Sequence, residues 1–313
     1  MRRLIVNADD FGLTSGVNQA IAEAHQRGIV TSTTLMANGR AFADAARLAR
    51  TNPNLSVGCH VVLVDGQPVS RPEQVHSLLA PAEKPPSVFR RGAVRRVAAT
   101  MAPRNSFYDG FGDIAKRSMR GQLRADQIEQ EVISQVQRLQ GAGIDVTHID
   151  THKHTHMLPR VADAVFRGAR ASGVRAIRNP FVPNTGLVLS HIIRRPILWK
   201  RFVGFSFLRG YNYDFRHRAE AAGLATPNGS FGVISTGALN EDIFRAVVDS
   251  IPEGTWEFVC HPGYNDDELS HVRTRLRDSR VKEFNLLTSP WAKQILDEHK
   301  VKLVSYRDLV ANQ

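Results

Sequence analysis

Cysteine is scarce in this sequence, whose 313 residues include only Cys59 and Cys260. Two cysteines cannot build a disulfide framework, and scattered glycine and proline exclude collagen-like and low-complexity classes. No uncharged apolar run approaches the roughly 20 residues that a membrane-spanning helix needs. The chain runs from Met1 to the pair Asp9-Asp10 without the apolar stretch of a secretory signal. We therefore expect a cytoplasmic protein with two free thiols.

Acidic residues are also in deficit, with 30 Asp and Glu against 41 Lys and Arg, a formal charge of +11. In the segments Phe89–Val97 and Ile192–Val203 the basic residues alternate with apolar ones, a pattern typical of a helix in a membrane interface. We expect peripheral contact with the anionic inner face of a membrane. The alternative is that these segments pack on the domain with solvated arginines. A nucleic-acid-binding protein would also explain the charge, but we find no recognised binding motif and expect no nucleic-acid partner.

Short β-branched runs alternate with segments of helical periodicity along most of the chain. The expected strands are Leu4–Asn7, Ile29–Leu35, Leu55–His60, Asp145–Ile149, Val174–Arg178, Phe231–Ser235, Thr255–Cys260 and Val301–Ser305. The expected helices are Gly16–Arg27, Ala41–Arg50, Asp126–Gly141, Arg160–Ser172, Asn240–Ile251 and those between Glu268 and His299. This alternation favours an α/β protein with a parallel sheet, either a barrel or a doubly wound sheet. We expect a single domain over residues 1–313, with excursions at about 61–121 and 182–230.

Polar residues cluster just after the expected strand ends. The pair Asp9-Asp10 follows the first strand, and Arg178 closes the fifth. Six of the twelve histidines fall in such short windows: His60, His148, His152, His154, His156 and His261. In both architectures the chemistry lies at the carboxyl ends of the strands, so we expect these side chains to meet there.

The aspartate pair and the run from His152 to His156 indicate a metal site. Adjacent carboxylates repel unless a cation or proton intervenes, although one could instead cap a helix. In an extended conformation His152, His154 and His156 share one face. One carboxylate and two imidazoles from separate strand ends could hold a divalent metal with open positions, either zinc or a harder ion such as magnesium or manganese. We predict one divalent metal ion.

The remaining polar residues could supply proton transfer. The aspartate of the pair that does not bind the metal could act as general base and His261 as general acid, while Arg178 could orient the basic carboxylate and hold it ionised. A bound metal would polarise a carbonyl group. A metal-dependent phosphoesterase could use the same residue types, but it often needs a second metal about 3.5–4 Å from the first. Metal stoichiometry therefore separates the two functions.

Several stretches together resemble the YdjC-like carbohydrate deacetylases. They are Asn7–Gly12, Thr31–Gly39, Gly58–His60, Thr147–Pro159 and Cys260–Pro262. The resemblance covers the chain from Arg3 to about Ser305. It implies a distorted parallel (βα) barrel of about seven or eight strands, as in the wider polysaccharide deacetylases. It also implies a metal-dependent hydrolase of the linear amide C–N bond that removes acetate from N-acetylated sugars.

Carried over by position, the resemblance implies a role for each site residue. Asp9 is the general base and His261 the general acid. Arg178, in the stretch Arg178–Phe181, resembles the arginine that orients the base in the wider superfamily. The implied metal ligands are Asp10, His60 and His152, with His154 as the alternative to His152.

Within the family, several stretches are similar to the branch associated with hopanoid biosynthesis. These are Gly58–Gly66, Asp150–His156, Ala176–Phe181 and His261–Asp266. The resemblance implies a lipid-linked substrate, an N-acetylglucosaminyl hopanoid that becomes a glucosaminyl hopanoid. Soluble chitooligosaccharides are the alternative substrates.

Overall fold

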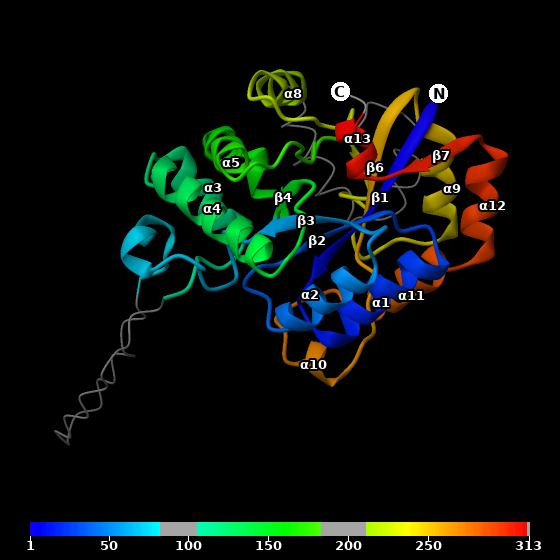
Figure 1. Ribbon diagram of the computed structural model, residues 1–313, viewed down its shortest axis with the longest axis horizontal. Helices are drawn as coiled ribbons and strands as arrows, with labels where there is room; N and C mark the ends of the chain where they lie inside the picture. Colours follow the sequence, from blue (N-terminus) through cyan, green and yellow to red (C-terminus); the bar gives the residue numbers. More distant parts are fainter. Residues whose placement is uncertain (82–104, 183–210, 312–313) are drawn as a thin grey trace, which may run out of the picture.

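The computed structural model describes residues 1–81, 105–182 and 211–311. Its strand β1 (Arg2–Phe11) runs through the middle of the sheet (Figure 1). Eight successive residues of β1 are buried: Val6 and Ala8 belong to the main apolar core, and Ile5 packs with Ala176 and Tyr306 on the opposite face. Strand β1 pairs with β2 (Ser32–Leu35), β6 (Gly254–Cys260) and β7 (Val301–Val304). The two ends of the chain therefore meet at one strand.

The described strands form one seven-stranded sheet in which every strand pair is parallel. Its order is β4-β3-β2-β1-β6-β5, with β7 beside β1. The strands not yet placed are β3 (Ser56–Val61), β4 (Ile149–Thr151) and β5 (Ser230–Phe231). Beyond β4, bridges join Ile149 to Ile177 and Ala176 to Ala225, so the sheet curls toward closure. This curled parallel sheet confirms the predicted distorted barrel.

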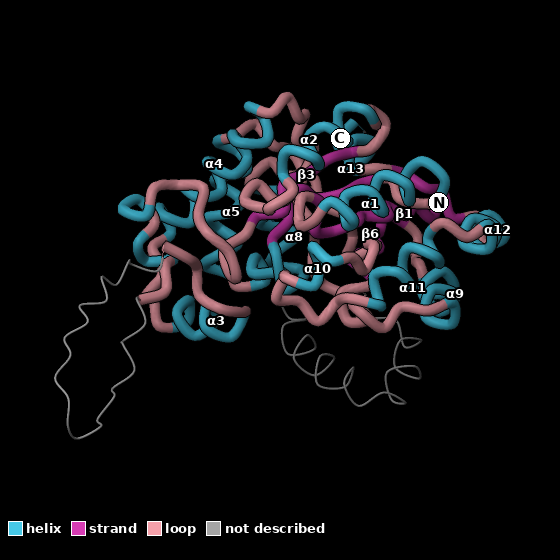
Figure 2. Tube along the Cα trace, turned by 90° about the horizontal axis from the view of Figure 1, so that it is seen from below, coloured by secondary structure: helices cyan, strands magenta, loops and turns pink. Residues whose placement is uncertain are grey.

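Helices surround the strands, which Figure 2 shows as an inner layer. The α-helices are α1 (Ser15–Arg27), α2 (Phe42–Thr51), α3 (Phe111–Met119), α4 (Ala125–Gly141), α5 (Pro159–Ala171), α8 (Tyr211–Ala221), α9 (Glu241–Ser250), α10 (Asp267–Ser270), α11 (Asp278–Leu287), α12 (Pro290–Glu298) and α13 (Tyr306–Ala311). Short 3₁₀ helices are η1 (Pro72–Gln74), η2 (His76–Leu78) and η3 (His152–Met157). The helical periodicity of the sequence placed the long helices within a few residues, since each buries an apolar stripe on the sheet.

Three expected strands are wrong in extent. The strand expected over Asp145–Ile149 spans Ile149–Thr151 instead. Val174–Arg178 contributes only isolated bridges, at Ala176 and Ile177. The strand expected over Phe231–Ser235 ends at Phe231, because Gly232 turns the chain with a φ of +87°. A Cβ at Gly232 would lie 2.1 Å from the carbonyl oxygen of Val259, so the close approach requires glycine.

The aspartate pair lies inside strand β1, not after it as predicted, because the strand continues to Phe11. Both cysteines are free, as predicted, and both are buried. The basic segments at 89–97 and 192–203 lie outside the described residues. In the described part of the chain, no helix combines the length and apolarity needed to cross a membrane.

Candidate active site

Asp10, His60 and His152 converge at the carboxyl edge of the sheet from β1, β3 and the start of η3. The Asp10 Oδ1 atom lies 3.6 Å from His60 Nε2 and 3.5 Å from His152 Nδ1. The two imidazole nitrogens are 3.2 Å apart. One carboxylate and two histidines, distant in sequence, thus present three ligand atoms to a common point.

The spacing of these atoms fits a metal ion. Ligands bound at about 2.0–2.2 Å to a tetrahedral or octahedral ion lie about 2.8–3.6 Å from one another. His60 is oriented by Asp150, whose Oδ1 lies 2.7 Å from His60 Nδ1, so Nε2 faces the convergence point. A carboxylate behind a ligating histidine is a usual outer-shell arrangement. Burial lowers the pKa of His60, but Asp150 and the charges of Asp9 and Asp10 outweigh it and raise the pKa to about 9.

Asp10 is held by an arginine far along the chain. Its backbone adopts a φ of +69°, which non-glycine residues rarely do. Arg280 Nη2 donates to Asp10 Oδ2 at 2.5 Å, which leaves Oδ1 facing the two histidines. Burial disfavours the charged carboxylate, but the Arg280 guanidinium holds the pKa of Asp10 well below its usual range.

Asp9 is bound at both oxygens by Arg178. The Nη1 and Nη2 atoms of Arg178 donate to Asp9 Oδ2 and Oδ1 at 2.9 and 2.6 Å. Burial opposes ionisation, but the guanidinium outweighs it and lowers the pKa of Asp9 well below its ordinary value. Asp9 is therefore a carboxylate throughout the neutral range, next to the three converging ligand atoms.

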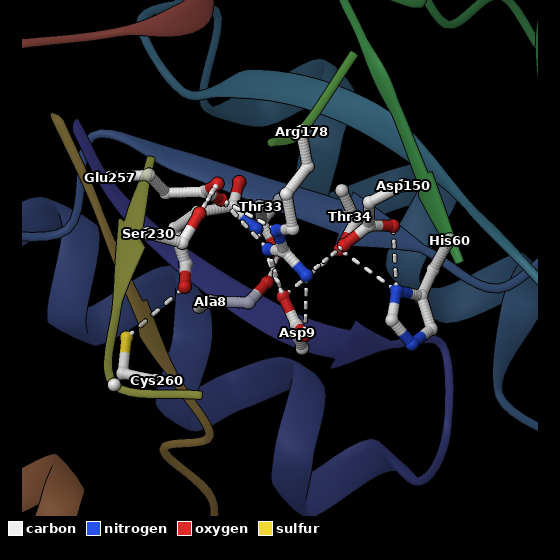
Figure 3. Close-up of polar contacts among 12 residues, drawn as sticks. Ala8, Asp9, Thr33, Thr34, His60, Asp150, Arg178, Ser230, Glu257 and Cys260 are labelled. Atoms are coloured by element: carbon white, nitrogen blue, oxygen red, sulfur yellow. Dashed lines mark hydrogen bonds and ion pairs between the residues drawn. The ribbon is translucent and has the colours of Figure 1, made fainter. Parts of the chain in front are cut away.

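Arg178 lies among three buried carboxylates (Figure 3). Besides Asp9, it contacts Asp150 Oδ2 at 2.5 Å and donates from Nε to Glu257 Oε1 at 2.9 Å. Asp9, His60 and Asp150 form a second group with metal-ligand spacing. The Arg178 guanidinium already supplies the positive charge between Asp9 and Asp150, so this second group does not need a cation.

His261 follows β6 and faces Asp9, with 3.8 Å between its Nε2 and Asp9 Oδ2. Its backbone N–H donates to Glu283 of α11 at 2.6 Å, which fixes the start of the loop. Among the described residues, no hydrogen-bond partner is present for the buried Nδ1 atom of His261. His261 is thus anchored through its backbone, and its imidazole lies beside Asp9.

The histidine run is not extended, so the expectation that His152, His154 and His156 share one face is wrong. Lys153 and His154 adopt φ values of +55° and +53°, which turn the chain inside η3. His152 therefore reaches Asp10, whereas His156 turns inward and its Nδ1 lies 2.6 Å from Thr151 Oγ1. His154 lines the cavity but does not join the group of three ligand atoms.

Buried His156 predicts acid sensitivity. Burial, followed by the charge of Arg178, lowers the pKa of His156 to about 3. Below pH 6.5 the unfolded chain binds a proton that the folded chain refuses, so stability falls as the pH falls toward 3. Such a group lowers the free energy of unfolding by about 1.4 kcal/mol as the pH falls from 7.5 to 5.5. In urea unfolding, the free energy of unfolding of His156→Asn should fall by about 1 kcal/mol less than that of wild type over this pH interval. Equal losses in the two proteins would contradict the prediction.

A cavity of about 880 Å³ opens above these residues. Asp9, Asp10, His60, His152 and His261 contribute to its wall. Much of the remaining wall is apolar, from Leu13, Met36, Phe111, Met157, Val233, Val272 and Leu276. The structure therefore brings five of the six predicted site residues to one cavity, and Arg178 lies directly behind Asp9.

Sequence reasoning assigned no role to three buried residues of this site: Asp150, Glu257 and Arg280. Asp150 stands in the stretch Thr147–Pro159, and Glu257 is the charged residue of strand β6. A charge inside an otherwise uncharged buried strand was an available signal for Glu257. Arg280 gave no such signal, because its partner Asp10 lies 270 residues away.

The fold and site together define an α/β protein with a curled parallel sheet and an Asp–His cluster that could hold a cation. The chain belongs to the YdjC-like protein family, which matches residues 3–298.

Similar curated proteins cover almost the whole chain. A carbohydrate deacetylase of Geobacillus stearothermophilus is 32% identical over 308 residues, 98% of each chain. A carbohydrate deacetylase of Brevibacillus brevis is 29% identical over 307 residues, 98% of this chain and 99% of the relative. A chitooligosaccharide deacetylase of Enterobacter sp. strain 638 is 31% identical over 311 residues, 98% of each chain.

A solved structure supports the fold. The crystal structure of an Enterococcus faecalis V583 protein, provisionally described as a cellobiose-phosphate cleavage protein, superposes with a TM-score of 0.73. It is 23% identical and covers 99% of both chains. At this identity the likeness concerns the arrangement of strands and helices alone.

Proposed function

We propose that this protein is a metal-dependent carbohydrate N-deacetylase that converts an N-acetylglucosaminyl hopanoid to its glucosaminyl form. The observation that carries the proposal is the convergence of Asp10, His60 and His152 beside the carboxylate of Asp9. The deacetylase names of the similar proteins support the activity. Hydrolysis of an amide needs a Lewis acid, a general base and a general acid. Residues of the cavity wall could hold a metal ion as the Lewis acid and could act as the base and the acid.

Asp10, His60 and His152 would hold the divalent ion, zinc or magnesium, and the bound ion supplies Lewis acidity toward the acetamide carbonyl oxygen. Asp9 accepts a proton from the water that attacks the carbonyl carbon. Arg178 keeps Asp9 ionised and fixes its plane, so that the carboxylate is in the correct state when the substrate arrives.

His261 acts on the other side of the reaction. Its imidazole donates a proton to the amine nitrogen as the C–N bond breaks, which makes the amine a better leaving group. The 3.8 Å between His261 Nε2 and Asp9 Oδ2 supports this pairing, because both side chains can then reach a single amide. Loss of acetate then leaves a free amino sugar.

The apolar wall supports a lipid-linked substrate. Phe111 of α3 and Met157 of η3 lie on the wall of the same cavity as the Asp–His cluster. A hopanoid skeleton gains free energy by leaving water for such a wall, whereas a chitooligosaccharide offers mainly hydroxyl groups. We also propose peripheral contact with an anionic membrane surface, on the basis of the basic, apolar segments 89–97 and 192–203.

The phosphoesterase alternative has less support. Such enzymes often use two ions about 3.5–4 Å apart. Here the group of Asp9, His60 and Asp150 already contains the Arg178 guanidinium. A binding stoichiometry of one ion per chain is the expected result, and two ions per chain would favour the phosphoesterase.

Acetate release from two substrates tests the proposal. We expect release from N-acetylglucosaminyl hopanoid in mixed micelles at a higher kcat/KM than from diacetylchitobiose. A chelator should abolish both reactions, and added zinc or magnesium should restore them. A higher kcat/KM for diacetylchitobiose would refute the lipid-linked substrate, and absence of acetate from both would refute the deacetylase.

A further inference from the structure

Glu257 is a fully buried carboxylate that contacts Arg178, the arginine bound to Asp9. Its Oε1 accepts from Arg178 Nε at 2.9 Å, and the same oxygen lies 2.8 Å from Arg178 Nη2. Its Oε2 accepts from Ser230 Oγ at 2.9 Å and from the Tyr306 hydroxyl at 2.8 Å. Glu257 does not line the cavity, so its charge serves the arginine and not a ligand.

Tyr306 reaches Asp9 by a second route. Its ring stacks on the His148 imidazole, with ring centres 3.7 Å apart and planes inclined by 7°. His148 Nε2 lies 3.1 Å from Asn7 Oδ1, and Asn7 Nδ2 donates to Asp9 Oδ1 at 3.0 Å. Gly58 makes room for this stack, because a Cβ there would lie 2.6 Å from the His148 ring.

These two routes join into a closed ring of buried contacts that includes Asp9. We propose that Glu257 and Tyr306 are positioning residues that fix the catalytic carboxylate of Asp9, with Glu257 acting through Arg178. The inference rests on the proposed role of Asp9 as general base. Tyr306 begins helix α13, beyond residue 298 where the family match ends.

The planar guanidinium explains how Glu257 acts at a distance. The Nη atoms of Arg178 bind Asp9, while Nε and Nη2 contact Glu257, so one rigid plane joins the two carboxylates. If Glu257 loses its charge, as in Glu257→Gln, a neutral hydrogen bond at most replaces the charged contacts behind this plane, while Asp9 and Asp150 still hold its other side. Misplacement of a catalytic group by about 1 Å can cost about 10²-fold in rate.

Single variants test whether the two residues affect the chemical step. Glu257→Gln should lower kcat for acetate release by roughly 10- to 100-fold, with KM and bound zinc per chain unchanged. Tyr306→Phe keeps the stack on His148 and removes one hydrogen bond, so its loss in kcat should stay within roughly tenfold. The matched controls Glu253→Gln and Tyr213→Phe, both at exposed side chains, should retain the wild-type kcat.

A double-mutant cycle separates positioning from mere support of the fold. Lysine at position 178 keeps the charge but cannot bind two carboxylates with one plane. If Glu257 acts through Arg178, Glu257→Gln in the Arg178→Lys background should change kcat by no more than about twofold. A loss of kcat in the double variant equal to the product of the two single losses would overturn the proposal. A wild-type kcat for Glu257→Gln would overturn it as well.

A measurement without substrate tests the inference independently of the proposed function. In ¹⁵N NMR of arginine-labelled protein, the Arg178 Nε–H signal is assigned by its loss in Arg178→Lys. We expect slow solvent exchange in wild type and at least about tenfold faster exchange in Glu257→Gln, while Glu253→Gln matches wild type. Unchanged exchange in Glu257→Gln would overturn the positioning role even if the protein releases no acetate, whereas absent acetate release with accelerated exchange refutes only the deacetylase.

Discussion

Replacement of Asp9 by asparagine should lower turnover of the N-acetylated sugar by roughly 10²–10⁴-fold, the usual contribution of general acid–base catalysis. Asparagine has a similar shape but cannot accept the proton of the attacking water. The carboxylate of Asp9 is buried and bound to Arg178 at both oxygens, so the variant loses a base that is held in one fixed position. Steady-state acetate release measures the effect.

Metal content distinguishes loss of the base from loss of the site. Because Asp10, His60 and His152 are intact, Asp9→Asn should bind one zinc per chain, as wild type does. The control Asp65→Asn changes another aspartate of the cavity wall, and it should retain turnover within a few fold. An Asp9→Asn protein with wild-type turnover would remove Asp9 from the mechanism.

Replacement of His152 by glutamine should abolish metal binding and activity together. Loss of even an outer-shell partner typically costs about 10–100-fold in metal affinity, and loss of a ligand atom should cost at least as much. Equilibrium dialysis against zinc measures the affinity, and acetate release at a zinc concentration that saturates wild type measures the activity.

His154 provides the matched control for this experiment. It belongs to the same run and lines the same cavity, yet its imidazole lies outside the group of three ligand atoms. His154→Gln should therefore bind zinc as wild type does. Retention of zinc by His152→Gln and its loss from His154→Gln would assign the ligand to the wrong histidine.

The convergence of the site was predictable because parallel strands place their carboxyl ends at one edge. Asp10, His60 and His152 stand at or near three such ends, and the sheet brings them close together. This convergence could be predicted without knowing the structure of the loops. The same reasoning placed His261 beside Asp9. Regular structure thus carried information over long stretches of sequence.

The local conformation of the histidine run was not predictable by alternation. Lys153 and His154 adopt left-handed backbone conformations, which the alternation of residue types does not reveal. A run in which histidines occupy every second position matches the pattern of a strand as well as it matches a turn. The turn inside η3 separates His152 from His156, so one residue joins the cluster and the other packs inside.

The partners of the buried arginines were also beyond reach. Arg280 projects from a helix that follows an irregular loop, and nothing in its neighbourhood marks Asp10 as its partner. Arg178 was expected to meet one carboxylate, but it contacts three, because β1, β4 and β6 each deliver one. The number of strands that face a side chain depends on the curl of the sheet, which local sequence does not encode.

Anomalous diffraction from crystals soaked in zinc locates the metal ion itself. We expect one strong peak per chain, in contact with Asp10 Oδ1, His60 Nε2 and His152 Nδ1, with Arg178 still bound to Asp9. A fully ordered site without a peak, or a peak held by other residues, would contradict this expectation.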